Sequence, residues 1–340
     1  MARVLLTGGG GYIGTTLAEM LLDRGHQVRI LDRFFFGEEL LEPIKNKDGL
    51  EIVKGDIRTV KQDIFNDIDV VMDLAALSND PAGELDPQKT LDINYLGRTR
   101  IAHLAKRAKV RRYILASSCS IYGFQEGILN EESPVNPLTT YAEANYLAEK
   151  AALHLASHNF TVVVLRQATV YGLSYRMRFD LAINGMTRGC FDRGIINVLR
   201  DGSQWRPFVH VRDTSRAFIL AMEAEAPEVN GQIFNVGSND QNIQILELAR
   251  RVAEGIEKPF QMEWYGDPDN RSYRVNFDKI ARVLGYKTEM TFEDGAKEIY
   301  QALAGGRVIT DDRSRTVVWY STLLEWKKRL DDILEHGEVL

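Results

Sequence analysis

Hydrophobic residues occur in short continuous runs along the first half of the chain, and longer stretches with hydrophobic residues at helical spacing separate most of these runs. The runs span Val4–Thr7, Val28–Asp32, Leu50–Gly55, Val70–Ala76, Tyr113–Ser118 and Thr161–Arg166. A strand that is hydrophobic at every position is covered on both faces, and strands that alternate with helices pair in parallel. The pattern therefore predicts an α/β fold with a doubly wound parallel sheet.

The pattern becomes looser after Gly172. The stretch 175–206 is rich in arginine, glycine and aromatic residues, and core-like patterns return at Phe208–Glu223 and Gln232–Val236. Hydrophobic residues then recur at helical spacing in three segments: Ile243–Gly255, Thr291–Gly305 and Trp319–Glu335. We therefore expect a sheet domain over residues 1–172, to which the chain returns at about 208–238, and a smaller C-terminal α/β lobe over 173–340.

The first hydrophobic run leads directly into a glycine-rich segment, Thr7–Gly14. Gly8 permits a tight turn after the strand, Gly11 lets the backbone approach a pyrophosphate, and Gly14 lets the next helix pack against the strand. The positive end of that helix dipole favours the same anion. Because the spacing alone also fits a glycine-rich turn without a ligand, its meaning depends on its neighbours.

An acidic residue ends the second hydrophobic run. Asp32 follows the glycines by about 20 residues, where a carboxylate binds the ribose hydroxyls of a dinucleotide. This charge repels a 2′-phosphate and favours NAD over NADP, although the neighbouring Arg33 is a residue type that accommodates such a phosphate. The sequence therefore predicts NAD as the cofactor.

Composition and charge exclude several other classes of protein. The 340 residues are 44% hydrophobic and 26% charged with a net charge of −6, so no basic face points to nucleic acid or an anionic membrane. Cys119 and Cys190 lie far apart without a CxxC motif, which predicts reduced thiols and neither a disulfide nor a metal site. Met1 leads directly into a strand and no run is long enough to span a bilayer, so we expect a cytoplasmic protein.

Several segments, in order along the chain, resemble the extended short-chain dehydrogenase/reductase family of NAD-dependent nucleotide-sugar epimerases and dehydratases. They are Thr7–Gly14, Asp56–Ile57, Leu74–Ala76, Ser117–Gly123, Leu165–Gly172, Arg206–Asp213, Phe234–Gly237 and Tyr273–Lys279. The resemblance covers essentially the whole chain, and the joint order of the segments is more specific than any one of them. It implies a Rossmann domain followed by a lobe that binds the nucleotide sugar.

The resemblance also implies which residues hold the cofactor. The glycine segment, with Tyr12 and Ile13, holds the pyrophosphate end, and Asp32, Asp56 and Ile57 lie beside the adenosine. Leu74, Ala75 and Ala76 lie along the cofactor. Asn94 begins a helix beneath the nicotinamide half. Simpler roles exist for some of them. Asp56 could only cap a helix, and the alanines could only allow tight packing.

In this family a Ser or Thr and a Tyr bind the sugar hydroxyl, and the Tyr exchanges its proton. Ser118 matches the first position. Two registers compete for the Tyr-x-x-x-Lys pair: the flanking Pro137 and Glu149 favour Tyr141 with Asn145, whereas Tyr146 with Lys150 is the literal match. We prefer Tyr141 with Asn145, because two anchors outweigh one short motif.

An asparagine at the lysine position changes the expected chemistry. A free phenol titrates near 10, and the family's ammonium helps to lower that pKa. Asn145 carries no charge but can still hydrogen-bond the nicotinamide ribose, so Tyr141 should keep its proton longer. A protonated phenol is a general acid, which favours reduction of a keto sugar over oxidation of an alcohol.

The residues after Ser118 bear on the reaction type. Relatives that catalyse 4,6-dehydration carry Asp-Glu there, whereas this chain has Cys119 and Ser120, which disfavours dehydration. Cys119 could serve as an unusual acid or base, but a buried thiol more commonly acts as a small hydrophobic group.

For the substrate, the resemblance places Asn184, Arg206 and Arg271 at the nucleotide diphosphate. Arg274 is an alternative to Arg271. The simpler role for these arginines is to form ion pairs on the protein surface. Tyr171, Tyr175 and Arg178 are weaker candidates for the sugar pocket, and His210 is expected to be structural. The resemblance also implies that the segments Asp92–Ala108 and Tyr141–Ser157 pair with a second subunit, and both are amphipathic enough to permit such a homodimer.

The sequence thus predicts an NAD-dependent enzyme that transfers hydride reversibly at a ring carbon of a nucleotide sugar, most simply C4, with epimerisation or ketoreduction as the outcome. A 4,6-dehydratase is the first alternative. The second is a protein that binds NAD(H) and senses it without turnover, which Asn145 makes conceivable.

Overall fold

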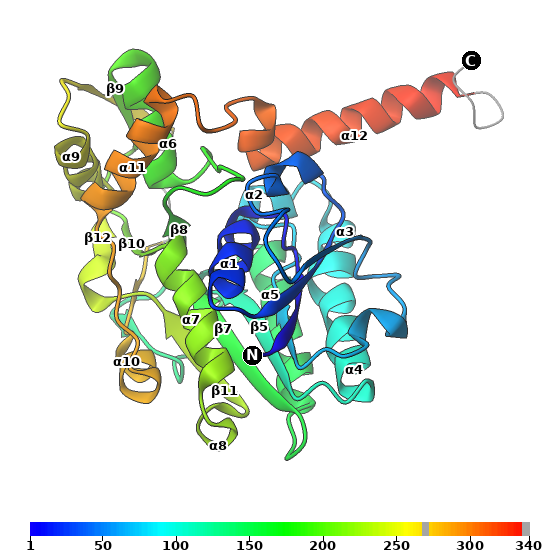
Figure 1. The fold of residues 1–340 in the computed structure, drawn as a ribbon. Helices are drawn as coiled ribbons and strands as arrows, with labels where there is room; N and C mark the ends of the chain where they lie inside the picture. The colour runs from blue at the N-terminus through cyan, green and yellow to red at the C-terminus, as the bar shows by residue number, and fades with distance from the viewer. Residues whose placement is uncertain (267–271, 335–340) are drawn as a thin grey trace.

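A computed structural model describes residues 1–266 and 272–334. At its centre lies a parallel seven-stranded sheet with the strand order β11-β7-β5-β4-β1-β2-β3 (Figure 1). The strands are β1 Arg3–Thr7, β2 Gln27–Asp32, β3 Leu50–Lys54, β4 Val70–Asp73, β5 Arg112–Ser118, β7 Thr161–Gln167 and β11 Gln232–Val236. The predicted parallel sheet is confirmed. Two predicted runs are shortened: β3 ends at Lys54, one residue before the predicted Gly55, and β4 ends at Asp73, before the predicted Ala76.

Helices cover both faces of this sheet, as the continuous hydrophobic runs require (Figure 1). Helices α1 (Tyr12–Asp23) and α7 (Val211–Glu223) pack together on one face, and α4 (Arg98–Arg107) and α5 (Thr140–His154) pack on the other. Val4 and Leu6 of β1 are buried in the first of these cores, and Leu5 is buried in the second.

A smaller lobe is built from the later part of the chain. Its three main helices, α6 (Ala182–Arg193), α9 (Ile245–Ile256) and α11 (Phe292–Ala304), pack together around a separate hydrophobic core. The remaining strands are β6 Ile128–Leu129, β8 Thr169–Tyr171, β9 Ile195–Leu199, β10 Trp205–His210, β12 Asn242–Gln244, β13 Gln261–Tyr265 and β14 Arg274–Val275. The shorter helices are α2 Asp80–Gly83, α3 Pro87–Thr90, α8 Ala226–Val229 and α10 Asp278–Leu284, and a π-helical turn spans Leu91–Gly97.

The segment predicted as one core element at 208–223 contains a strand end and a helix. His210 divides them, because its imidazole caps α7 by accepting a hydrogen bond from the Arg212 backbone amide at 3.2 Å. The ring is fully buried and its Nε2 lies 2.7 Å from Glu298. These contacts agree with the expected structural role of His210.

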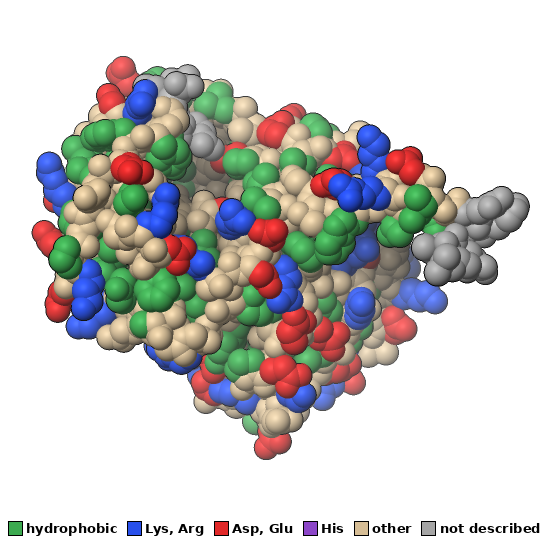
Figure 2. All heavy atoms as spheres, turned by 90° about the horizontal axis from the view of Figure 1, so that it is seen from above, with side chains coloured by type: hydrophobic (Ala, Val, Ile, Leu, Met, Phe, Trp, Pro, Cys, Tyr) green, Lys and Arg blue, Asp and Glu red, His purple; other side chains and the backbone are tan. Residues whose placement is uncertain are grey.

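The last helix, α12 (Thr316–Ile333), projects from the body of the molecule (Figure 1). It begins earlier than the predicted Trp319, and the predicted end at Glu335 lies outside the described residues. Hydrophobic side chains are interspersed with charged ones on its surface (Figure 2); those exposed by 36–60% are Val318, Leu324, Trp326, Leu330 and Ile333. Within residues 1–266 and 272–334, the structure contains no helix that is both long and apolar enough to cross a membrane.

A buried ion pair fixes α5 on the sheet. The Glu149 carboxylate accepts hydrogen bonds from Arg166 Nε at 3.0 Å and Nη2 at 2.7 Å, and from the Ser117 hydroxyl at 2.5 Å. Arg166 Nη1 also donates to the Tyr122 hydroxyl, which donates to Asn235 Oδ1. The network joins the helix to strands β5, β7 and β11.

We predict that Glu149→Gln lowers the free energy of unfolding by about 3–5 kcal/mol, because it leaves the buried Arg166 charge without its counter-ion. Urea denaturation measures this change. The control is Lys150→Gln, which removes the exposed charge next along the helix and should change stability by less than about 1 kcal/mol. Equal stability of the two variants would contradict the assigned role of the ion pair.

Candidate active site

The loops that follow β1, β2, β4 and β5 meet at the carboxyl edge of the sheet and line a cleft of about 450 Å³. This is the edge at which doubly wound sheets bind ligands, and the volume lies within the range of small-molecule sites. Residues from the second lobe close the opposite wall of the cleft, among them Arg178 and Arg206.

The glycine segment forms one end of the cleft, and its backbone leaves no room for side chains. Gly8 has a φ of +70°, which glycine adopts without strain. A Cβ on Gly14 would lie 2.2 Å from the Gly8 carbonyl oxygen, so only glycine lets α1 approach the strand this closely. Helix α1 has Gly11 as its N-cap without a side-chain hydrogen bond, which leaves its first amides to face a phosphate. This cradle fits the pyrophosphate of a dinucleotide.

Asp32 lies beside that cradle, where the sequence predicts the ribose carboxylate. Its Oδ2 accepts from the Gly10 amide at 3.0 Å and its Oδ1 accepts from the Phe34 amide at 2.7 Å. Burial raises the pKa of Asp32, and these amides oppose that increase. Each carboxylate oxygen has a second lone pair, so the group can still accept a ribose hydroxyl.

Asp56 and Ile57 also line the cleft, together with Leu74, Ala75 and Ala76. The side chain of Asp56 pairs with Arg58 at 2.6 Å and with Arg33 at 2.9 Å, and the Arg58 hydrogen bonds lower its pKa to about 2. Arg33, the candidate for a 2′-phosphate, is thus bound to a carboxylate.

Asn94 does not line the cleft, in contrast to its predicted role as a cofactor contact. It is fully buried in the π-helical turn, and its side-chain amide bonds both the N–H and the carbonyl of Leu77 at 2.8 and 3.0 Å. Because this side-chain amide both donates to and accepts from the Leu77 backbone, Asn94 fixes the loop after β4. That loop faces the cleft.

The C-terminal part of the chain covers the same end of the cleft. Tyr320 of α12 lines it, and the Trp319 indole donates to the Phe35 carbonyl at 2.5 Å. Tyr320 packs against Phe36, and the buried Arg176 guanidinium lies 3.7 Å from the centre of the Phe36 ring. The structure thereby joins the loop after β2 to residues almost three hundred positions later.

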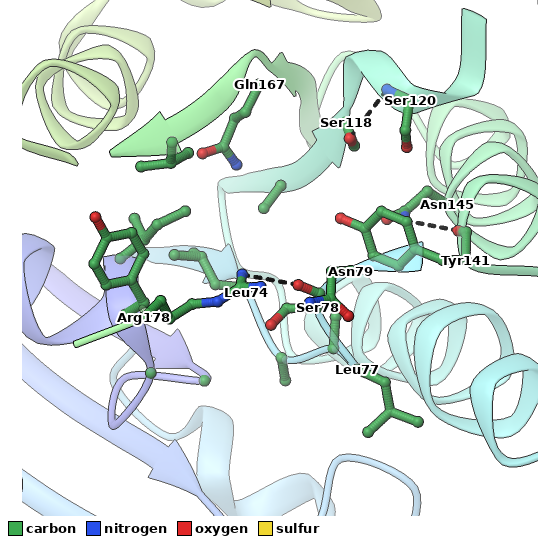
Figure 3. A pocket seen from close by; sticks show the side chains of 18 of the residues that line it. Leu74, Leu77, Ser78, Asn79, Ser118, Ser120, Tyr141, Asn145, Gln167 and Arg178 are labelled. Atoms are coloured by element: carbon green, nitrogen blue, oxygen red, sulfur yellow. Dashed lines mark hydrogen bonds between the residues drawn. The ribbon is translucent and has the colours of Figure 1, made fainter. Parts of the chain in front are cut away.

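Tyr141 and Ser118 both line the other end of the cleft, and the Tyr141 hydroxyl is turned toward Ser118, whose hydroxyl lowers the pKa of the phenol (Figure 3). Ser118 ends β5 and also accepts from the Ser120 amide at 3.1 Å. Tyr141 lies in the first turn of α5. Burial raises the pKa of the Tyr141 phenol above its ordinary value, so the group is protonated at neutral pH.

Asn145 lies one turn after Tyr141 and also lines the cleft. Its Nδ2 donates to the Tyr141 carbonyl at 2.8 Å, and its Oδ1 accepts from Arg98 Nη1 at 2.8 Å. The competing pair lies elsewhere: neither Tyr146 nor Lys150 lines the cleft, and the exposed Lys150 ammonium lies 4.8 Å above the Tyr146 ring.

The positions that follow Ser118 place no acid in the cleft. Cys119 is fully buried, its thiol donates to the Arg166 carbonyl at 3.3 Å, and burial raises its pKa. Ser120 lines the cleft with a hydroxyl. The expected packing role of Cys119 therefore agrees with its surroundings.

The predicted substrate residues divide into three cases. Arg206 lines the cleft and stacks on the Tyr273 ring at 5.4 Å, whereas Arg271 lies outside the described residues. Asn184 does not reach the cleft: its amide is used by the Tyr12 hydroxyl, the Arg178 carbonyl and the Gly172 amide, all within 3.1 Å. Asn184 thus has a structural role: it fixes the backbone behind the cleft wall through these three hydrogen bonds.

The weaker candidates for the sugar pocket divide similarly. Arg178 lines the cleft, with its Nη1 bound to the Ser78 carbonyl at 2.8 Å (Figure 3). Its Nη2 is paired with Asp180 at 2.6 Å. Tyr171 is buried against Gln241 and Met290, and Tyr175 donates to Glu19, so neither lies at the cleft.

Sequence reasoning missed Arg98, Arg176 and Tyr320, all of which line the cleft. Arg98 occurs in a strongly basic helix, so nothing in the local pattern distinguishes it from the exposed Arg100. Arg176 and Tyr320 reach the cleft only through the fold of the second lobe.

Comparison with known proteins agrees with this geometry. The model of the "NAD dependent epimerase/dehydratase family" matches residues 4–237. The chain belongs to this family. The predicted extended short-chain dehydrogenase/reductase fold and the predicted cofactor, NAD, are thereby confirmed.

Members of the family with similar sequences catalyse different reactions. The chain is 30% identical over 306 residues to a UDP-glucose 4-epimerase of Mycolicibacterium smegmatis, and the alignment covers 86% of this chain and 96% of that protein. It is 28% identical over 313 residues to a dTDP-glucose 4,6-dehydratase of Streptomyces niveus, and the alignment covers 87% of this chain and 91% of that protein. Family membership confirms an NAD-dependent nucleotide-sugar enzyme and is consistent with both reactions.

A solved structure shows the same architecture with ligands. MoeE5 in complex with UDP-glucuronic acid and NAD aligns with a TM-score of 0.79 and 26% identity, covering 89% of this chain and 99% of MoeE5. Both lobes of this family member are therefore represented in the present chain.

We predict that Gly14→Ala weakens NAD binding by more than about tenfold, because the added methyl would push the cradle apart. Isothermal titration calorimetry measures the affinity. Gly305→Ala is the control: it lies just after α11 far along the chain, and its new Cβ would have the Arg307 side chain and the Gln301 carbonyl oxygen both at 3.3 Å, against 2.2 Å for the nearest atom at Gly14. Unchanged affinity in Gly14→Ala would argue against the cradle as the cofactor site.

Proposed function

We propose that this chain acts on a nucleotide-diphosphate sugar by reversible hydride transfer at a ring carbon, most simply C4, with epimerisation or ketoreduction as the outcome. One observation carries the proposal: Tyr141 and Ser118 line the same cleft as the dinucleotide cradle, close enough for the Ser118 hydroxyl to lower the pKa of the Tyr141 phenol. A sugar hydroxyl placed between them is within reach of both.

NAD fits the cleft residues, and when bound it accepts hydride from the sugar carbon and can return it. Gly8, Gly11 and Gly14 would hold the pyrophosphate and Asp32 the ribose, while Asp56, Ile57 and the loop after β4 would flank the rest of the cofactor. Asn145 would orient the nicotinamide ribose.

Proton transfer is the task of the two hydroxyls. Ser118 would bind the reacting oxygen of the sugar, and Tyr141 would donate a proton to it in reduction or remove one in oxidation. Because burial keeps Tyr141 protonated at neutral pH, donation is the favoured direction.

The arginines in the second wall support an anionic substrate. Arg178 and Arg206 line the cleft opposite the sheet edge, and guanidinium groups bind diphosphate oxygens in bidentate fashion. Relatives named as UDP- and dTDP-sugar enzymes are consistent with this class of substrate.

Dehydration is the less favoured reaction for this site. In a dehydratase, the resemblance would place an acid directly after Ser118. Here that residue is Cys119, which is buried in the core and holds its proton. The next residue, Ser120, supplies only a hydroxyl. Elimination of water needs an acid and a base beyond the Tyr141 phenol. Product analysis by NMR with UDP-glucose and dTDP-glucose distinguishes a C4 epimer from a 4-keto-6-deoxy sugar.

We predict that Tyr141→Phe lowers kcat by about 10²–10⁴-fold with a small change in KM, because it removes the proton carrier and keeps the ring. Steady-state conversion of the nucleotide sugar measures this. Tyr146→Phe is the matched control on the same helix and should retain activity, since Tyr146 does not line the cleft. A loss confined to Tyr146→Phe would reverse the assignment.

We predict that alcohol oxidation rises with pH by about tenfold per unit through the neutral range. The pKa of Tyr141 is raised, so the ionised base is scarce at pH 7 and becomes more abundant as the pH increases. Absorbance of the reduced nicotinamide, measured with saturating sugar at a series of pH values, tests this. A flat profile would mean that Tyr141 ionisation does not limit oxidation.

We also propose a homodimer formed through the helices predicted for this role. Helices α4 and α5 cover one face of the sheet, and Leu96, just before α4, is 52% exposed. Light scattering should give twice the 38.5 kDa chain mass, and Leu96→Arg should shift the equilibrium toward the monomer. A monomer at micromolar concentration would contradict this arrangement.

A further inference from the structure

Arg98 is a buried cation beside the proposed catalytic pair. Only 1% of the residue is exposed, and the side chain lines the cleft. Its Nη2 donates to the carbonyl oxygens of Asp73, the last residue of β4, and of Ala116, two residues before the end of β5. Its Nη1 donates to Asn145 Oδ1 at 2.8 Å. A guanidinium does not lose its proton in a protein, so a full positive charge is held in this position.

No carboxylate neutralises this charge by direct contact in the described part of the chain. The nearest candidate by sequence, Asp73, turns its carboxylate to the hydroxyls of Thr7 and Tyr113, each at 2.5 Å, and offers Arg98 only its carbonyl. Arg98 therefore lines the cleft without a directly bonded counter-ion among the described residues, although the Asp73 carboxylate lies close enough for Arg98 to lower its pKa.

We propose that Arg98, held beside Tyr141 by its bond to Asn145, supplies the positive charge near the phenol that a lysine on the helix of Tyr141 supplies in the pattern this chain resembles. The inference rests on the proposed role of Tyr141. Arg98 is a positioning residue: it contacts Asn145, which in turn binds the Tyr141 carbonyl at 2.8 Å.

The charges around both groups define what Arg98 contributes. Burial raises the pKa of Tyr141 most and Asp80 raises it further, whereas Arg98, the Ser118 hydroxyl and Arg178 lower it. Arg98 itself faces the Asp73 carboxylate and the Tyr113 hydroxyl, which bond each other. A positive charge in the same buried site favours the ionised form of a phenol, so removing Arg98 should raise the pKa of Tyr141.

The pairing also explains why position 145 is neutral. A lysine there would place a second cation against the Arg98 guanidinium, and like charges repel strongly in a site shielded from water. Asparagine instead presents an acceptor to Arg98 and a donor to the Tyr141 carbonyl. Arginine at 98 and asparagine at 145 are thus complementary, and the cation enters from α4 in place of α5.

The test measures Tyr141 ionisation directly, without cofactor or turnover. Protein labelled with 3-fluorotyrosine, whose phenol is more acidic, is titrated by ¹⁹F NMR, and Tyr141→Phe assigns the resonance. Arg98→Gln and Arg98→Met should raise the Tyr141 midpoint by about one pH unit or more, and Arg98→Lys should raise it less. Arg100→Gln, an exposed residue on the same helix, is the matched control and should leave the midpoint unchanged.

A charge-relocation variant tests the complementarity. In Arg98→Gln/Asn145→Lys the cation moves to α5, and the midpoint should return toward that of the unaltered protein. The pH at which the oxidation rate is half-maximal should shift in parallel in every active variant. Circular dichroism confirms which variants are folded.

A folded Arg98→Gln or Arg98→Met protein with an unchanged midpoint would overturn the proposal. If neither variant folds, Asn145→Lys is compared with Arg98→Gln/Asn145→Lys: the variant that keeps Arg98 should have the lower midpoint, and equal midpoints in the two would overturn the proposal. Failure of the proposed function is a separate result, because it would appear as full activity in Tyr141→Phe whatever the Tyr141 titration shows.

Discussion

The Glu149–Arg166 ion pair is the interaction on which the geometry of the cleft depends. Residues 141, 145 and 149 follow one another at four-residue spacing and therefore lie on one face of α5. Because Glu149 is bound to β7 and, through Ser117, to β5, that face is turned to the sheet. The helix then directs Tyr141 and Asn145 over the carboxyl edge, where Ser118 ends β5. A buried charge pair carries a large desolvation cost, and its value here is the orientation of α5.

The same spacing explains why the literal Tyr-x-x-x-Lys motif does not form the site. Tyr146 and Lys150 share a different face of α5, away from the cleft, and Lys150 is exposed. The charge that is absent from position 145 enters from α4 as Arg98, which is held by backbone carbonyls of β4 and β5. In this chain, the electrostatics of the site is therefore divided between two helices.

The cleft joins segments that are far apart in the chain. The cradle comes from residues 8–14, the loop after β2 is covered by Tyr320 of α12, and Arg178 and Arg206 approach from the second lobe. The chain makes this possible by leaving the sheet after β7 and returning to it as β11, so that the second lobe faces the carboxyl edge. Hydrogen bonds across the two lobes, such as that from the Tyr12 hydroxyl to the Gly172 carbonyl at 2.7 Å, fix the two walls together.

The sequence by itself determined the parallel sheet, the glycine cradle and the position of Asp32, because these depend on local patterns: continuous hydrophobicity, glycine spacing and an acid at a strand end. It also indicated Ser118, Tyr141 and Asn145, which stand in recognisable segments. Only the tertiary structure decided which polar side chains reach the cleft. Asn94 and Asn184 turn their amides to backbone and hydroxyl partners behind the wall, whereas Arg98, Arg176 and Tyr320 enter it. The direction of a long polar side chain follows from the partners that burial offers it, and those partners come from distant parts of the chain.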